Sequence, residues 1–310
     1  MNLRSFRHGL IDHYKHRYIT YSKALLSLYR TRKIRYKKLS TSELKLYKSS
    51  DTIFILGSGP SLNSLTLEQI NHINKHDSFG INYSFFKREI IPTYHSFGWH
   101  KGRYNRWKVL FSPFREQYKD VVVMMHTKAL YSRLVHPRFI PILFPIDPII
   151  FLYTIPESII LKEERMITDE EFNKSLLYRG SLSLALDLVV RMGYIRIVLL
   201  GVDLDTNKHF WYQYSEMQPD KIMHEEAYKN MNSESRFESQ ITKPNKMLSF
   251  DKYLFYLSRY LKKVRGISLY SGFNNRILSD FLPSYFTLIY FSLNNIEFRL
   301  VLNTLIASIN

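Results

Sequence analysis

The residues best suited to chemistry in this chain of 310 form a glycine-containing turn. The sequence TIFILGSGPSL carries a short apolar run into Gly57, Ser58, Gly59 and Pro60, and Ser61 then opens a polar segment. A strand that passes through such a turn into a helix presents backbone N–H groups to a phosphate. The glycines allow close approach of the backbone, and the Ser61 hydroxyl can cap the helix or donate to a phosphate oxygen. The turn therefore predicts a nucleotide site.

Two common phosphate-binding fingerprints are missing from this turn. Leu62 stands where the third glycine of a dinucleotide-binding motif would fall, and no Gly-Lys-Ser/Thr follows as a P-loop requires. The sequence therefore disfavours NAD and ordinary ATPase chemistry. The alternative interpretation is a tight strand-to-helix turn without a ligand, which is common in α/β proteins.

A second candidate site follows the apolar segment YIRIVLLGVDLD. Asp203 and Asp205 form an Asp-x-Asp pair directly after Gly201. Two carboxylates on one loop suit Mg²⁺ or Mn²⁺ bridging a diphosphate, although one of them could instead cap the following turn. We expect Gly201 and Asp203 at the nucleotide site, and a Mg²⁺ or Mn²⁺ site at Asp203 and Asp205 stays open as an alternative.

The catalytic candidates are His209, His224 and Asp205. Histidine titrates near neutral pH, so it can take a proton from a sugar hydroxyl. Solvated loop residues are the alternative interpretation for each of them and for three further candidates, His100, Glu225 and Glu226. Aromatic residues beside His209 can stack on a base or sugar, or can pack this segment down: Phe210, Trp211, Tyr212 and Tyr214.

Apolar runs alternate with helical stretches along the chain. The predicted strands are 52–56, 78–81, 93–97, 121–125, 195–200 and 267–270, and the predicted helices are 181–192 and 249–264, each followed by a glycine. The polar stretch 207–246 is a candidate lid. This order predicts an α/β, Rossmann-like fold (a GT-A-like variant) with a mostly parallel sheet flanked by helices.

Ligands of open α/β sheets bind beyond the carboxyl ends of the strands. If the strands are adjacent, that edge collects Gly57–Ser61, Asn82, His95–Trp99 and Gly201–Asp205. The Asn82 amide could read a base or ribose, or could serve only the turn that closes its strand.

The net charge of +17 is concentrated at one end of the chain. Residues 1–50 hold thirteen basic and two acidic residues, with apolar and aromatic residues at helical spacing. We expect a basic amphipathic helical arm that suits an anionic membrane surface, with a solvated helix as the alternative. Nucleic acid is a less favoured partner, because the chain carries no recognisable binding motif.

The remaining organisation follows from composition. We expect a catalytic domain over 51–280, with the lid at about 206–248, and an apolar tail over 281–310. Phe281–Ile296 is uncharged but shorter than the ~20 residues of a spanning helix, so attachment in the membrane plane or packing onto the domain is expected. The absence of cysteine excludes disulfides and thiolate zinc sites. The first eighteen residues lack a continuous apolar run, so we expect no secretory signal and a cytoplasmic protein, peripheral at the inner membrane.

Four segments, taken in order, resemble the bacterial sialyltransferases of glycosyltransferase family 42 and their relatives: IFILGSGPSL, FGINYSFF, RGSLSLALDLVVRMGYIRIVLLGVDLD and ISLYSGFNNRILSDF. The resemblance spans about Thr52 to Phe281. It implies that the glycine loop and its serine bind the CMP part of CMP-sialic acid, that Asn82 contacts the nucleotide, and that Ser181 lies near the donor. It also implies that no metal is required.

The chain departs from that family at several positions. Asp205 and Trp211 stand where the family has tyrosines, and Glu238–Asn245 lacks the family's catalytic histidine. Either His209 or His224 then takes that role, or the chemistry differs. The donor is then another CMP-activated acidic sugar such as Kdo, or it is not a CMP-sugar.

The sequence supports three hypotheses. The first is an inverting glycosyltransferase that moves an acidic sugar from a CMP-sugar to a surface glycan or lipid-linked acceptor, as in lipopolysaccharide or capsule synthesis. The second is a pyrophosphokinase-like enzyme that uses ATP and Mg²⁺, and the third is a non-catalytic membrane- or nucleic-acid-binding module. The sequence leaves the acceptor, the linkage and the oligomeric state open.

Overall fold

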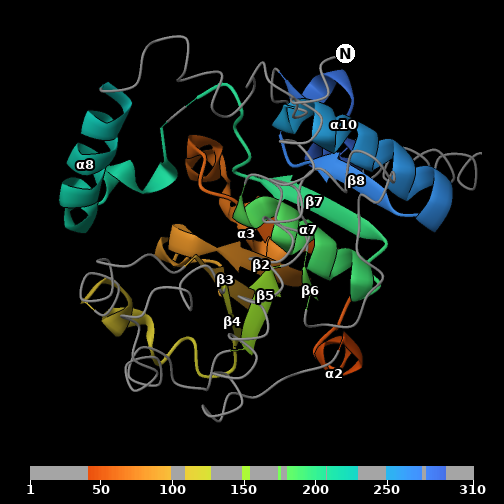
Figure 1. Ribbon diagram of the computed structural model, residues 1–310, viewed down its shortest axis with the longest axis horizontal. Coiled ribbons are helices and arrows are strands. Elements are labelled where there is room, and N and C mark those ends of the chain that lie inside the picture. Colours follow the sequence, from red (N-terminus) through yellow and green to blue (C-terminus); the bar gives the residue numbers. More distant parts are fainter. Residues whose placement is uncertain are drawn as a thin grey trace, which may run out of the picture. The chain divides into compact units, whose positions relative to one another are not determined.

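The computed structural model describes residues 41–98, 109–126, 149–153, 174–175, 180–206, 208–229, 249–273 and 277–290. The chain, drawn in Figure 1, forms two compact units. Unit 1 comprises Met1–Ser49 and Phe79–Gly193, and unit 2 comprises Ser50–Ser78 and Tyr194–Asn310. Of the predicted basic arm, the described part includes helix α2 (Thr41–Lys45). Residues 1–40 lie outside the described residues, so the amphipathic arm stays a prediction.

Unit 2 contains three parallel strands. They are β1 (Thr52–Leu56), β7 (Arg196–Leu200) and β8 (Ser268–Ser271), in the order β1-β7-β8. Every residue of β1 is buried, as expected for a parallel strand covered on both faces. The three strands predicted at 52–56, 195–200 and 267–270 are confirmed to within one residue.

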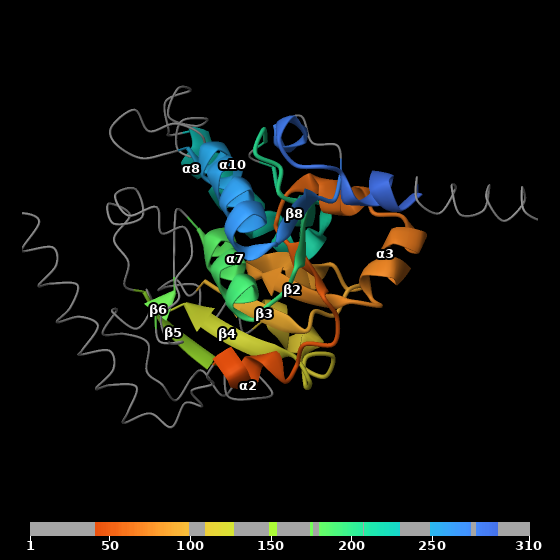
Figure 2. The ribbon, with the colours of Figure 1, turned by 90° about the vertical axis from the view of Figure 1, so that its right-hand side faces the viewer.

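The helices of unit 2 are mostly short. They are η1 (Pro60–Ser64), α3 (Leu67–Ile73), η6 (Phe210–Gln213), η7 (Ser215–Met217), α8 (Gln218–Lys229), α10 (Phe250–Tyr260), the π-turn η8 (Leu261–Arg265) and η9 (Leu278–Asp280). Figures 1 and 2 both show α10 beside β8. Gly266 ends η8 with a φ of +67°, which confirms the glycine predicted after this helix.

The first residues of the predicted tail pack onto unit 2. The ring of Phe54 in β1 lies 5.3 Å from the ring of Tyr285 and 6.3 Å from that of Phe286, measured between centroids. Both tail residues are buried. Residues 291–310 lie outside the described part of the chain. No helix among the described residues is long and apolar enough to cross a membrane.

Unit 1 contains the other strands. Strand β2 (Asp77–Ile81) enters it at Phe79 and is followed by β3 (Tyr94–Phe97), β4 (Val122–His126), β5 (Ile149–Tyr153) and β6 (Lys174–Ser175). They pair in parallel in the order β6-β5-β4-β3-β2. Its helices are η2 (Asn82–Phe86), η3 (Ser112–Phe114) and α7 (Ser181–Arg191).

The predicted fold class is confirmed: this is an α/β protein whose strands pair in parallel and are joined by helices. The predicted strands at 78–81, 93–97 and 121–125 match β2, β3 and β4 to within one residue, and the helix predicted at 181–192 matches α7. The sequence analysis missed β5, β6 and α8. Helix α8 reads QPDKIMHEEAYK, and its few apolar side chains give almost no helical periodicity.

Candidate functional site

The glycine loop of unit 2 is held against the segment that follows β7. The N–H of Gly57 donates to the carbonyl oxygen of Leu200 at 2.8 Å, and the N–H of Gly59 donates to that of Gly201 at 2.7 Å. A Cβ atom on Gly57 would lie 2.4 Å from the carbonyl oxygen of Gly201. Gly57 is therefore required for the approach of two backbone segments as well as for any approach of a ligand.

Asp203 braces this loop. Its Oδ2 atom accepts the N–H of Ser61 at 2.7 Å, and a Cβ atom on Gly59 would lie 2.3 Å from the same oxygen. Gly59 thus provides the space that the carboxylate occupies. Because that carboxylate accepts the Ser61 N–H, a phosphate cannot take this donor while Asp203 stays in place.

The turn after Gly59 differs from the sequence-based expectation of a helix start at Ser61. The segment is the short 3-10 turn η1, and the α-helix begins only at Leu67. Thr66 caps that helix through a capping box with Gln69. The hydroxyl-bearing residues Ser58 and Ser61 are both partly exposed on the loop. Their hydroxyls, together with the backbone of the loop, are what unit 2 offers a phosphate here.

The described part of the predicted lid is tied to the same loop. The N–H of Phe210 donates to the carbonyl oxygen of Ser58 at 2.9 Å, and Asn63 donates through Nδ2 to the carbonyl oxygen of Phe210 at 3.1 Å. Gln213 in turn donates to Asn63 at 3.0 Å. These bonds place His209, the residue before η6, next to the glycine loop.

The aromatic residues around His209 pack against one another. The His209 ring lies parallel to that of Trp211, with centroids 4.8 Å apart, and Tyr212 meets both rings edge-on. Phe210 and Trp211 are buried, whereas Tyr212 and Tyr214 remain partly exposed. Asp205 is exposed on the preceding loop. His224 lies in α8, and its side chain is outside the described part.

In unit 1, Asn82 and Ser181 are brought together from positions 99 residues apart. Asn82 donates through Nδ2 to the Ser181 hydroxyl oxygen at 3.3 Å, and its Oδ1 accepts the N–H of Gly98 at 2.7 Å. Asn82 has a φ of +50°, and it is the non-glycine residue with positive φ among the described residues. Ser181 opens α7. Within the described part of the chain, the Ser181 hydroxyl proton and the second Nδ2–H of Asn82 have no acceptor, so both can donate to a ligand.

The backbone of Asn82 is fixed by His95, which the sequence analysis placed at this edge of the sheet without assigning it a role. His95 donates through Nε2 to the carbonyl oxygen of Asn82 at 2.9 Å, and its Nδ1 accepts the hydroxyl proton of Tyr118 at 2.9 Å. His95 is fully buried, and burial lowers its pKa to about 3. Burial also raises the pKa of Tyr118 well above its ordinary value, so the phenol keeps its proton. The neutral imidazole therefore has one tautomer available, with the proton on Nε2.

Gly80 makes room for this histidine. It pairs with His95 across β2 and β3, and a Cβ atom on Gly80 would lie 2.4 Å from Nδ1 of His95. A glycine inside a buried strand often marks a place where another group packs closely against the backbone. Gly80, two residues before Asn82, was therefore the sequence signal that could have indicated this contact.

The structure thus assembles two groups of the predicted site residues. In unit 2 they are Gly57, Ser58, Gly59, Pro60, Ser61, Gly201 and Asp203, with Asp205 and His209 following, and in unit 1 they are Asn82 and Ser181 with His95 behind them. His100 lies outside the described residues, and Glu225 is exposed on α8. Within the described part, no group of three or more His, Asp or Glu side chains could hold a metal ion.

The bracing role of Asp203 makes a testable prediction. Asp203→Asn keeps an oxygen that can accept the Ser61 N–H, so we expect its unfolding free energy to stay within about 1 kcal/mol of the unmodified protein. Asp203→Ala leaves that N–H without its partner and is expected to lose about 1–3 kcal/mol in urea unfolding. Asp205→Ala, at the exposed neighbouring carboxylate, is the control and should change little. Equal losses for Asp203→Asn and Asp203→Ala would show that the charge matters rather than the hydrogen bond.

Comparison with known proteins gives matches among solved structures. No protein-family model matches the chain, and no curated protein matches it. Similar solved structures include the monofunctional α-2,3-sialyltransferase Cst-I from Campylobacter jejuni, with 15% identity and a TM-score of 0.42 over 76% of this chain and 80% of that chain. They also include the sialyltransferase CstII from Campylobacter jejuni in complex with cytidine-5'-monophosphate, with 14% identity and a TM-score of 0.37 over 75% of this chain and 84% of that chain.

A third similar structure is the sialyltransferase CST-II in complex with a trisaccharide acceptor and CMP. It is 14% identical, with a TM-score of 0.38 over 75% of this chain and 85% of that chain. At these identities and TM-scores the likeness assigns no activity to the chain.

Proposed function

We propose that this chain is a glycosyltransferase that moves an acidic sugar, sialic acid, Kdo or a similar one, from a CMP-sugar donor to a surface glycan or lipid-linked acceptor. The sequence motifs provide the class of donor through their resemblance to family 42 sialyltransferases. The protein would work at the inner face of a membrane, where such acceptors are made.

One observation carries this proposal. The family resemblance implies that Asn82 contacts the nucleotide and that Ser181 lies near the donor, and these two residues form a hydrogen bond to each other. Asn82 does so from a left-handed backbone conformation that few residues other than glycine adopt. Backbone outliers that the surrounding structure enforces concentrate at functional sites.

The proposed reaction is a displacement at the anomeric carbon. A base takes the proton of the acceptor hydroxyl, the resulting oxygen forms the new glycosidic bond, and the bond between the sugar and the phosphate breaks with release of CMP. His209 and His224 are the proposed bases. In unit 1, the Asn82 amide and the Ser181 hydroxyl would stabilise the negative charge that develops on the leaving nucleotide.

The structure gives the ATP and Mg²⁺ hypothesis no specific support. That hypothesis relies on Asp203 and Asp205 as metal ligands, whereas the bond from the Ser61 N–H gives the Asp203 carboxylate a role in the loop that needs no metal. We therefore propose donor binding that needs no metal.

Thermal unfolding with nucleotides tests the proposal. CMP is expected to raise the melting temperature in the presence of EDTA, whereas UMP, GDP and ATP should do so less. Ser181→Ala should reduce the shift caused by CMP, because it removes a donor and the partner of Asn82. Ser258→Ala, which removes a hydroxyl bonded to the carbonyl oxygen of Phe255 in α10, is the matched control. Stabilisation by ATP with Mg²⁺ alone would replace this proposal with the kinase-like one, and no stabilisation by any nucleotide would favour a non-catalytic module.

A further inference from the structure

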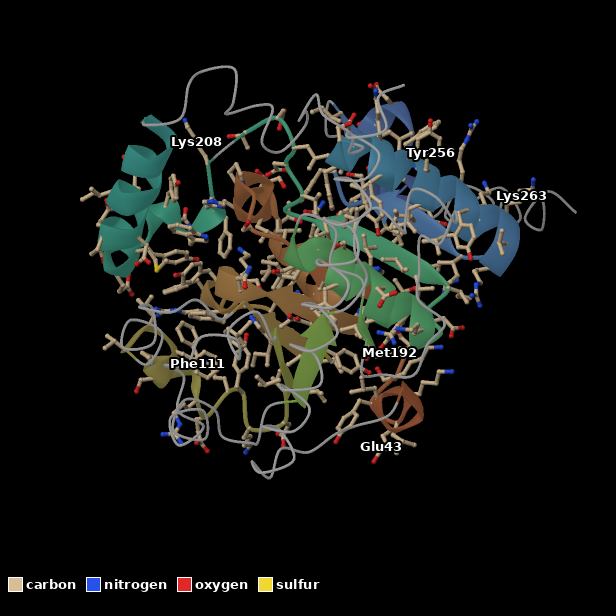
Figure 3. The ribbon with its side chains drawn as sticks, in the orientation of Figure 1. Glu43, Phe111, Met192, Lys208, Tyr256 and Lys263 are labelled. Atoms are coloured by element: carbon tan, nitrogen blue, oxygen red, sulfur yellow. The ribbon has the colours of Figure 1, made fainter. Side chains whose placement is uncertain are left out.

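Helix α10 and the turn η8 present a basic and aromatic stripe on the outside of unit 2. The stripe consists of Lys252, Tyr256, Arg259 and Lys263, spaced four, three and four residues apart, and all four are exposed. This spacing places them along one side of a helix. Figure 3 shows Tyr256 and Lys263 along the outer side of this helix.

The opposite side of the same helix is anchored in the core. Its buried residues are Phe250, Tyr253, Leu254, Leu257 and Leu261. The helix therefore cannot turn its basic stripe inward without losing that core contact. The stripe is a fixed feature of the surface of unit 2.

The stripe combines positive charge with exposed apolar area. Lys262 and Arg265 add two further exposed basic residues, and the one acidic residue of α10 and η8, Asp251, is only partly exposed. Tyr256 is 47% exposed and Val264 is 58% exposed. The Arg259 guanidinium lies 4.8 Å from the ring centroid of Phe255, which keeps a charge directly over an aromatic face.

We propose that this stripe docks the protein onto an anionic membrane surface. A lipid headgroup layer offers negative charge to the lysines and arginines and an apolar boundary to Tyr256 and Val264. A tyrosine at such a boundary keeps its ring in the apolar layer and its hydroxyl in water. Nucleic acid would satisfy the charges but leaves exposed Val264 without a role.

This surface is separate from the predicted arm over 1–50 and the predicted tail over 281–310. It also does not depend on the proposed glycosyltransferase activity, because its test needs no substrate. A chain that does not bind vesicles can still bind nucleotides, and a chain that does not bind nucleotides can still bind vesicles.

Flotation of the full chain with vesicles tests the proposal. We expect binding to vesicles of phosphatidylcholine with phosphatidylglycerol, and weaker binding to phosphatidylcholine alone. Lys252→Glu/Lys263→Glu should weaken binding to the anionic vesicles by about 30-fold, equivalent to about 1 kcal/mol for each lysine. The matched control is Lys75→Glu/Lys119→Glu, which changes the net charge equally at two exposed lysines on other elements.

Circular dichroism should show the same fold for both double variants, because all four lysines are exposed. An equal loss of vesicle binding in the control would overturn the proposal, since only total charge would then matter. Unchanged vesicle binding of Lys252→Glu/Lys263→Glu, with or without a loss of binding to a single-stranded RNA oligomer, would overturn it as well. A selective loss in the stripe variant supports it.

Discussion

Gly57→Ala is expected to destabilise the folded chain by about 3 kcal/mol. The added Cβ would lie 2.4 Å from the carbonyl oxygen of Gly201 and 3.1 Å from that of Leu200. Both contacts are to backbone, and the Gly57 N–H is itself bonded to Leu200. Relief therefore requires β1 and the segment after β7 to separate, which breaks buried hydrogen bonds. Urea unfolding of the purified variant measures the loss.

Two other glycines provide controls for this prediction. Gly180→Ala should be nearly neutral, because no atom beyond Gly180 and its two chain neighbours lies within 4 Å of the added Cβ. Gly59→Ala should fall between the two, because its added Cβ meets the side chain of Asp203, which can move. The double variant Gly59→Ala/Asp203→Gly removes that clash, so its loss should be smaller than the sum of the losses of the two single variants. A Gly57→Ala protein as stable as Gly180→Ala would contradict the close backbone approach.

His95→Gln is expected to make the folded chain less sensitive to acid. The folded-state pKa of His95 is about 3, below the ordinary value of 6.5, because the ring is fully buried. Between pH 3 and pH 6.5, the unfolded chain therefore binds up to one more proton at this position than the folded chain. Stability is full above pH 6.5 and falls as the pH drops toward 3, by up to about 1.4 kcal/mol per pH unit.

Comparison of the two proteins isolates the contribution of His95. Burial also lowers the pKa values of His72 and His76, but those residues are present in both proteins, so their contribution cancels. Glutamine can still donate to the carbonyl oxygen of Asn82, so His95→Gln should fold at neutral pH. Chemical unfolding at a series of pH values gives the two slopes. Identical slopes below pH 6.5 would contradict a buried neutral imidazole.

The same histidine links stability to the candidate site. His95 holds the carbonyl oxygen of Asn82, and the Asn82 amide holds Ser181. Tyr118→Phe removes the hydrogen bond that the Tyr118 hydroxyl donates to Nδ1 of His95. We expect this change to make the position of Asn82 less well defined, although Tyr118 itself contacts no ligand in the proposed site. A positioning role predicts a weaker affinity for CMP in this variant, with a smaller change in the turnover of bound donor.

The sequence was most informative where local pattern and tertiary structure agree. The predicted strands of both units match observed strands because buried parallel strands read as apolar runs. The glycines predicted to follow the helices lie after α7 and η8, and Gly193 and Gly266 both have positive φ. In these cases neighbouring residues alone determine the outcome.

The sequence was least informative where long-range contacts decide. Nothing near Asp203 indicates that its carboxylate accepts an N–H from a residue 142 positions earlier. The role of His95 depends on Tyr118, Gly80 and the pairing of β2 with β3, which no local pattern contains. The sequence was sufficient to name candidate nucleotide-binding residues. The contacts that hold those residues in place could be seen only in the structure.

Release of CMP from a sugar donor tests the proposed function most directly. The full chain is incubated with CMP-sialic acid or CMP-Kdo and a mixture of glycan acceptors in EDTA, and free CMP and the glycosylated product are quantified. We predict that one of these donors is consumed without added metal, and that Ser181→Ala slows this reaction while Ser258→Ala does not. The proposed function would be contradicted if the folded protein consumed neither donor, with or without Mg²⁺, and also failed to bind CMP.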